Sequence, residues 1–245
     1  MPSSKGIFHF KKSKIKLIMR LDKLIAQSTA FSRAQAKGII RGGKVTVNGE
    51  VAKSGAIKLD DDAIVEYMGV SIKKPEPQYI MFNKPAGVVC ANVDEDHETV
   101  FDKLFLPRMD TLHIAGRLDI DTTGLILITD DGQWSHKITS PKHNHEKTYL
   151  IDLDTAITEK QIRILTEGVQ LKSEAKRSLP AKVEVVSDLQ IKMTITEGKY
   201  HQVKRMMAAV GNHVVKLHRQ QIGTIELDAA LKPGEWRKLT LDEIG

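Results

Sequence analysis

The segment 116–124, Gly-Arg-Leu-Asp-Ile-Asp-Thr-Thr-Gly, constrains the fold of this chain more than any other. Glycines enclose it, and it lies between two apolar segments, 113–115 and 125–129, whose composition is typical of buried strands. One arginine, two carboxylates and two hydroxyls therefore stand at the edge of a rigid core, which is a typical place for chemistry. The sequence predicts an enzyme.

A length of 245 residues with 41% hydrophobic residues is sufficient for two domains. The single cysteine, Cys90, excludes an intrachain disulfide and a cysteine-rich zinc site, and it fits a reducing cytoplasm. No apolar run approaches the roughly 20 residues that a membrane span needs, and the N-terminal segment lacks the features of a secretory signal. We expect a cytoplasmic protein with no membrane partner and no metal site.

The net charge of +6 is weak evidence for a nucleic-acid partner. Residues 1–18 hold five lysines and no acidic residue, so the rest of the chain has 32 basic and 31 acidic residues, a net charge of +1. We interpret 1–18 as a basic, disordered extension, although its lysines could also bind phosphate. Only local clusters of basic side chains can support an RNA partner.

Residues 19–72 are predicted to form a small module. Leu21, Leu24 and Ile25 form the apolar stripe of a first helix. Ser32, followed three residues later by Gln35, is a capping box that opens a second helix. The Gly42-Gly43 pair ends that helix, and the Asn48-Gly49 pair predicts the tight turn of a hairpin.

Three cations, Arg33, Lys37 and Arg41, recur every four residues and lie along one face of the second helix. Such a stripe alone is as often an ordinary solvated face. However, residues 19–58 hold eight basic and two acidic residues, and the helix, glycines and hairpin together resemble the S4 RNA-binding domain. The resemblance implies that these cations contact RNA phosphates.

Residues 73–78 form a polar, proline-bearing linker, and 79–245 a second domain. Its strand-like segments outnumber its helical ones, which predicts an α+β domain on a mixed, largely antiparallel sheet with flanking helices. The predicted strands are 79–83, 113–115, 125–129, 147–153, 182–186, 189–196 and 214–217, and the predicted helices are 99–106, 158–166 and 201–210.

Four stretches of the second domain fit one family. They are Phe-Asn-Lys-Pro-Ala-Gly at 82–87, the loop 116–124, Lys-Thr-Tyr at 147–149, and Glu-Gly-Lys-Tyr-His-Gln-Val-Lys-Arg-Met at 197–206. Together they resemble the catalytic domain of the pseudouridine synthases. With the S4-like module and the segment 129–136, the chain resembles, from residue 19 to nearly its end, the members that act on 16S ribosomal RNA.

This resemblance implies a monomeric enzyme that converts one uridine of 16S ribosomal RNA, or of a small-subunit assembly intermediate, to pseudouridine. The implied target is uridine 516. Relatives that act on 23S ribosomal RNA share the fold and the loop, so they remain the alternative. Because the reaction only moves a glycosidic bond from one base atom to another, it demands no redox cofactor and no metal.

By resemblance, Asp119 is the catalytic aspartate. An ionised carboxylate can attack C1′ or C6, or can take a proton from C2′ to give a glycal, and the sequence leaves these routes open. Without the family match, Asp119 could instead be a turn residue that caps its own backbone. Asp121 raises a rival chemistry, because two carboxylates recur in glycoside hydrolases. We interpret Asp121, Thr122 and Thr123 as residues that fix the loop or contact RNA.

The resemblance assigns three further roles. Arg117 helps to open the RNA and to fill the space of the extruded nucleotide, although it could instead form a surface ion pair with either aspartate. Tyr149 stacks on the target uracil, although a tyrosine in an apolar strand is more often a core residue. Lys204 pairs with Asp119 and keeps it ionised.

Two more candidates lie near the C-terminus. Leu217 matches the apolar residue that packs against the uracil, with core packing as an equal description. Arg205 belongs to the segment 199–219, which has five basic residues, no acidic ones and three histidines without a metal-ligand arrangement. This segment is predicted to bind phosphates beside the site.

Two other classes of function remain open. A non-catalytic RNA-binding or ribosome-assembly protein would use the S4-like face alone. A glycosidase would release free uracil from RNA, whereas an isomerase would release none.

Overall fold

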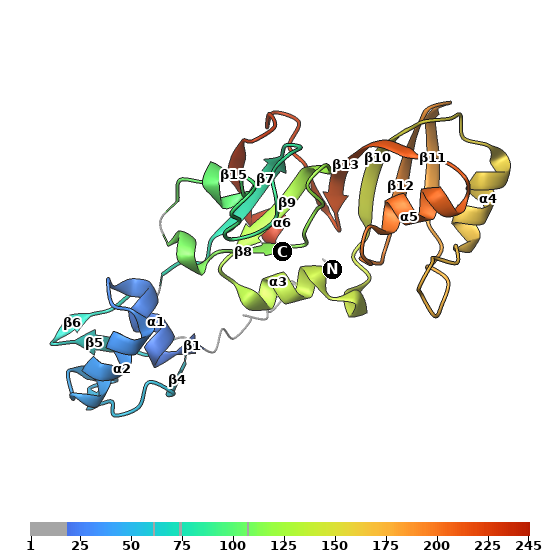
Figure 1. Cartoon of the computed structure of the whole chain (residues 1–245). Coiled ribbons are helices and arrows are strands. Elements are labelled where there is room, and N and C mark those ends of the chain that lie inside the picture. Colours follow the sequence, from blue (N-terminus) through green and yellow to red (C-terminus); the bar gives the residue numbers. More distant parts are fainter. Residues whose placement is uncertain (1–18, 61, 74, 107) are drawn as a thin grey trace, which may run out of the picture. The chain divides into compact units, whose positions relative to one another are not determined.

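The computed structural model describes residues 19–60, 62–73, 75–106 and 108–245. They form two compact units that separate between Glu76 and Pro77, inside the predicted linker (Figure 1). The predicted N-terminal extension, 1–18, lies outside the described residues.

The N-terminal unit contains two helices, α1 (Leu21–Ser28) and α2 (Arg33–Arg41), and a four-stranded antiparallel sheet of order β3-β2-β5-β6. The strands are β1 (Met19–Arg20), β2 (Val45–Val47), β3 (Glu50–Val51), β4 (Lys58–Leu59), β5 (Val65–Tyr67) and β6 (Val70–Ser71), and β1 pairs with β4. The predicted capping box is present, because Ser32 and Gln35 each accept a hydrogen bond from the other's backbone N–H. The predicted turn is present as well, since Asn48 and Gly49 have φ of 52° and 83°.

The C-terminal unit is built on one nine-stranded sheet, with β11-β12-β10-β13-β9-β7-β15 as its main path, β14 beside β13 and β8 beside β9. Only the β9–β13 pair is parallel. The strands are β7 (Tyr79–Lys84), β8 (His113–Ala115), β9 (Thr123–Thr129), β10 (Lys147–Leu153), β11 (Lys182–Ser187), β12 (Gln190–Ile195), β13 (Val214–Ile222), β14 (Ile225–Glu226) and β15 (Trp236–Lys238). The predicted α+β class with a mixed, largely antiparallel sheet is confirmed.

The two faces of the sheet are covered by separate cores. On β7, Ile80 and Phe82 belong to the larger core, whereas Met81 between them belongs to the smaller one, as the alternation of a strand requires. The larger core takes residues from α4 (Glu159–Glu167) and α5 (Gln202–Ala209), and the smaller core takes residues from α3 (Gly132–Thr139) and α6 (Leu241–Ile244). Both faces are therefore buried along β7 and β9, which makes this part of the sheet a rigid base.

Some predicted elements are wrong. The helix expected at 99–106 is only a short 3₁₀ turn, η1 (Phe101–Lys103), because the chain becomes extended at Leu104, whose side chain is buried in the larger core with that of Phe101. Two further 3₁₀ turns, η2 (Met109–Thr111) and η3 (Pro141–His143), α3 and β15 were not predicted, and β13 extends to Ile222. Within the described ranges, every helix is too short or too polar to cross a membrane.

The parallel pair joins the two halves of the sheet at a close backbone contact. Gly124 on β9 lies opposite Arg219 on β13 and has φ of 102°. A Cβ atom at Gly124 would lie 2.3 Å from the carbonyl oxygen of Arg219, so the second glycine of the 116–124 loop permits both the turn and the strand pairing.

We expect Gly124→Ala to lower the free energy of unfolding by at least about 2 kcal/mol, because strained backbone and a steric clash add. Gly132→Ala is the matched control, since a Cβ there meets open space in a helical backbone. Urea unfolding measures both. Equal stability of the two variants would contradict this account of the β9–β13 contact.

Candidate active site

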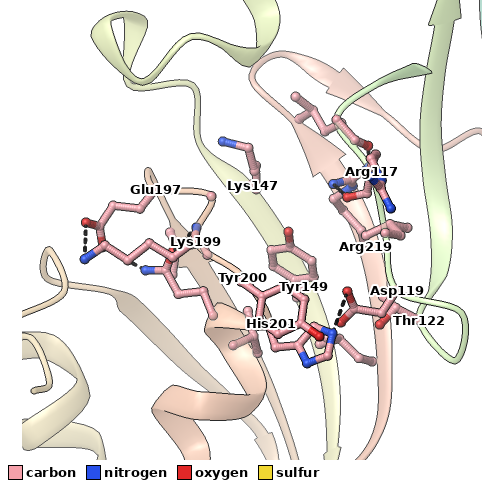
Figure 2. Close-up of a pocket in the computed structure, with 18 of the residues that line it drawn as sticks. Arg117, Asp119, Thr122, Lys147, Tyr149, Glu197, Lys199, Tyr200, His201 and Arg219 are labelled. Carbon is pink, nitrogen blue, oxygen red and sulfur yellow. Dashed lines mark hydrogen bonds and ion pairs between the residues drawn. The ribbon is translucent and has the colours of Figure 1, made fainter. Parts of the chain in front are cut away.

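The loop 116–124 borders a cavity of about 1290 Å³ in the C-terminal unit (Figure 2). The cavity lies over β10 and β13 and is closed on one side by the segment before α5. Five of the predicted site residues line it: Arg117, Asp119, Tyr149, Lys204 and Leu217. Residues from three of the four family stretches, 116–124, 147–149 and 197–206, are thus brought together with Leu217, whereas the stretch 82–87 lies outside the cavity lining.

The buried ammonium of Lys84, at the end of β7, binds the C-terminal half of the loop 116–124. Its Nζ atom donates hydrogen bonds to the carbonyl oxygens of Pro85, Ile120 and Thr122, at 2.9, 3.0 and 2.8 Å. Burial lowers the pKa of Lys84, but three carbonyl oxygens and the carboxylates of the loop favour its charged form. The lysine therefore fixes the backbone on both sides of Asp121.

Arg219 joins the first residue of the loop to the strand that follows the loop. This side chain is only 2% exposed, and its guanidinium donates to the carbonyl oxygens of Leu125 at 2.9 Å and Gly116 at 2.7 Å. Between the two cations, the Leu118 N–H donates to Sγ of Cys90 at 3.3 Å, and the Gly87 N–H donates to the Ile120 carbonyl at 2.9 Å. The turn that carries Asp119 is anchored along its whole length.

The carboxylate of Asp119 lies between two basic groups. Nε2 of His201 is 3.3 Å from one oxygen, and Nζ of Lys204 is 3.4 Å from the other (Figure 2 shows the contact with His201). Lys204 therefore reaches Asp119 as predicted. His201 lies beside Asp119 as well, a position that its place in the basic segment does not predict.

The shortest contacts of Lys204, however, go to the neighbouring carboxylate of Asp121, at 2.6 and 2.8 Å. This hydrogen bond lowers the pKa of Asp121, against a smaller effect of burial. Lys204 therefore bridges the two carboxylates, because both come from the same turn and the lysine has three donors.

Tyr149 and Leu217 form the floor of the cavity on adjacent strands, and both are buried. Tyr149 pairs with Arg219 in the register of β10 and β13 (Figure 2). Arg117 is exposed at the rim. Among the described residues, Asp119 contacts Lys204 and His201, and Asp121 contacts Lys204. Arg117, which is described too, therefore forms no ion pair with either aspartate, unlike the alternative left open by the sequence.

The segment 199–219 does not form the open basic surface that its composition predicts. Acidic residues neutralise it: Lys199 pairs with Glu197, two residues before it, whereas Arg205 pairs with Glu174 and Lys216 with Asp152 from more distant parts of the chain. Arg205 lies outside the cavity lining and also donates to the carbonyl oxygens of Tyr200 and Lys172. Its guanidinium holds a neighbouring loop in place, and contact with RNA stays a prediction for this residue.

The cations predicted on the S4-like module are placed as expected. Arg33, Lys37 and Arg41 are all exposed on α2, and Arg33 also lies 3.6 Å from the buried carboxylate of Asp22. Their contact with RNA phosphates stays a prediction. In the described part of the chain, no group of three histidine, cysteine, aspartate or glutamate side chains could hold a metal ion.

Lys84→Met tests the grip on the loop. We expect a loss of about 3 kcal/mol in unfolding free energy, because three carbonyl oxygens lose a charged donor inside the protein. We also expect hydrogen exchange at the Thr122 amide to be faster in the variant than in the wild type, while exchange at core amides changes less. Lys182→Met, at an exposed lysine that pairs with Glu146, is the control and should change neither quantity. Unchanged exchange at Thr122 in the Lys84 variant would disprove the grip.

Lys204→Met tests the bridge. The pKa of Asp121 is depressed by Lys204, so any stability from this pair is present above the ordinary aspartate pKa and is lost as pH falls through the depressed one. Without the ammonium we expect the pKa of Asp121 to rise toward its ordinary value in an NMR titration of the carboxyl carbons. Lys216→Met, beside Asp152, should leave Asp121 unchanged. The interpretation fails if both variants give the same titration of Asp121.

Comparisons with known proteins show the family of this chain. Residues 78–209 match the RNA pseudouridylate synthase family, and residues 19–65 match the S4 domain. The chain is 54% identical over 227 residues to the ribosomal small subunit pseudouridine synthase A of Escherichia coli (strain K12), covering 92% of this chain and 98% of that protein.

The corresponding protein of Vibrio vulnificus (strain CMCP6) is 50% identical over 228 residues, with the same coverage. A crystal structure of a pseudouridylate synthase aligns with a TM-score of 0.67 at 47% identity, over 92% of this chain and 98% of that one. The chain belongs to the RNA pseudouridylate synthase family and is an S4-containing enzyme of that family.

Proposed function

We propose that this enzyme converts a uridine of 16S ribosomal RNA, uridine 516, to pseudouridine. The main support is the likeness to the small subunit pseudouridine synthases, which extends over 98% of their length and includes the S4 domain. The substrate is the free RNA or a small-subunit assembly intermediate. We place the reaction in the cytoplasm, which fits the single cysteine, and assign it to a monomer, as the resemblance implies.

The reaction centre is Asp119. The N1–C1′ bond of the target uridine breaks, the uracil turns, and C5 joins C1′ while the C5 proton leaves and N1 gains one. Attack on C1′, attack on C6 and removal of a C2′ proton each begin with the ionised carboxylate. Two contacts support this role: the ammonium of Lys204 lies beside one carboxylate oxygen and attracts its negative charge, and Nε2 of His201 lies beside the other.

The substrate uridine must leave the RNA stack before Asp119 can reach its sugar, at a cost of a few kcal/mol. Arg117 is the group that assists this extrusion, since it is exposed at the rim two residues from Asp119. Tyr149 then stacks on the extruded uracil, and Leu217 packs against it. Their burial on the cavity floor supports these roles, because a flat base displaces water there.

The S4 domain supplies affinity and not chemistry. The exposed cations of α2, Arg33, Lys37 and Arg41, bind phosphates of the RNA largely without regard to sequence, so the salt dependence of binding resides in this unit. The chemistry resides in the second unit, where Lys204 contacts both Asp119 and Asp121. Asp121 thereby fixes the position of the Lys204 ammonium beside Asp119.

Asp119→Asn separates catalysis from binding. We expect pseudouridine formation to fall by at least about a thousandfold, because the amide can act neither as nucleophile nor as base. RNA binding in a filter assay should persist. Asp110→Asn, in η2 and outside the cavity lining, is the control with wild-type activity. A variant at Asp119 that forms pseudouridine at the wild-type rate would remove this residue from the mechanism.

The target is tested by mapping pseudouridine in total ribosomal RNA from cells with and without the gene. Loss of one pseudouridine at position 516 of 16S RNA is the expected result. Loss of a site in 23S RNA would transfer the enzyme to the alternative substrate, and release of free uracil in vitro would indicate a glycosidase.

A further inference from the structure

A tyrosine ring stands open to solvent at the rim of the cavity, outside the floor that Tyr149 occupies. Tyr200 is 76% exposed although it is aromatic, and it lines the cavity immediately before α5 (Figure 2). Its ring stacks on the imidazole of His201, with centroids 3.7 Å apart and planes 20° apart. The imidazole in turn contacts Asp119 at 3.3 Å.

The backbone is strained to make this arrangement. His201 has φ of 46° and ψ of 35°, a left-handed conformation that is uncommon for any residue with a side chain, although histidine adopts it more often than most. The conformation places consecutive aromatic side chains face to face, and side chains on consecutive residues do not adopt this arrangement in a regular strand. Strain of this kind persists only where the surroundings enforce it.

The surroundings do enforce it. Oε1 of Gln202 accepts a hydrogen bond from the Lys199 N–H at 2.9 Å, and Nε2 of Gln202 donates to Glu197 at 2.7 Å. On the other side, Arg205 donates to the carbonyl oxygen of Tyr200 at 3.1 Å. The segment that presents the two rings is therefore fixed before any substrate binds, which lowers the entropy lost when a ligand meets them.

A fixed and exposed aromatic ring beside a nucleotide pocket suits a nucleobase. Extrusion of the target uridine removes a stacking partner from each neighbouring base. Every base has a flat face, so a tyrosine can replace that partner whatever the sequence. Tyr149 cannot serve a second base, because it is buried on the floor of the cavity.

We propose that Tyr200, backed by His201, is a stacking platform for the base adjacent to the target uridine. This inference rests on the proposed RNA substrate and adds a second base-binding site to it. The continuous contact from Tyr200 through His201 to Asp119 means that a base seated on the platform brings its neighbouring nucleotide to the carboxylate in a fixed register.

The test uses the full-length enzyme and a short RNA that contains the uridine found by mapping, together with two RNAs that lack the base on its 5′ or its 3′ side. Tyr200→Leu should raise KM for the intact RNA about tenfold while kcat changes little, and Tyr200→Phe should restore KM. On one of the two RNAs without a neighbouring base, the wild type and Tyr200→Leu should have the same KM. Leu241→Ala, an exposed apolar residue on α6, is the surface control.

The inference is overturned if Tyr200→Leu keeps the wild-type KM, or if its defect is the same size on all three RNAs. If the wild type itself forms no pseudouridine in the intact RNA, the proposed function has failed, and that outcome is visible before any variant is compared. Should Tyr200→Leu not fold, Tyr200→Trp provides a second measurement: its fluorescence should be quenched by the intact RNA and not by the RNA that lacks the stacked base. Equal quenching by all three RNAs overturns the inference too.

Discussion

The site depends on two buried cations that hold the carbonyl oxygens of one loop. Lys84 and Arg219 project from strands that face the loop 116–124 and donate to its backbone near each end. A turn rich in polar groups would otherwise exchange these bonds with water and move. Because the donors are charged and sheltered from solvent, their hydrogen bonds are stronger than those between neutral groups, and Asp119 is presented on a backbone with little freedom.

The same loop joins the two halves of the sheet. Its last residues, Thr123 and Gly124, form the short parallel pair with β13, and every other pair in this sheet is antiparallel. The floor of the cavity therefore comes from one half, through Tyr149 and Leu217, and the carboxylate from the connection to the other. The orientation of Asp119 over the floor therefore depends on the backbone contact between β9 and β13. Gly124 occupies that contact because a side chain there would clash with the backbone of Arg219.

Much of this arrangement could be predicted from local sequence. Glycines at 116 and 124, the capping box at Ser32 and the Asn48-Gly49 turn each follow from short-range backbone chemistry, and the structure confirms them. Asp119, Tyr149, Lys204 and Leu217 were brought together only by the family motifs, because no local rule relates residues so far apart. Their roles stay predictions.

The partners of charged side chains could not be predicted from the sequence. Composition places Arg219 on a basic surface, whereas it is buried, and Lys204, Arg205 and Lys216 meet acidic residues from distant parts of the chain. Composition reports charge along the chain, whereas neutralisation depends on the fold. The one available signal for Lys84 was its position at the end of an apolar strand, where a lysine can be buried only if several acceptors surround its ammonium.

The sole cysteine gives the loop an intrinsic reporter. Cys90 is buried, burial raises the pKa of its thiol, and its sulfur accepts the N–H of Leu118 directly beside Asp119. An alkylating reagent needs an accessible thiolate, and Cys90 also lines the cavity, so the reagent can reach the sulfur through the cavity or when the turn in 116–124 opens. The rate of alkylation in the folded enzyme thus measures access to this thiol from the cavity side, and protection by bound RNA would show that the substrate covers it.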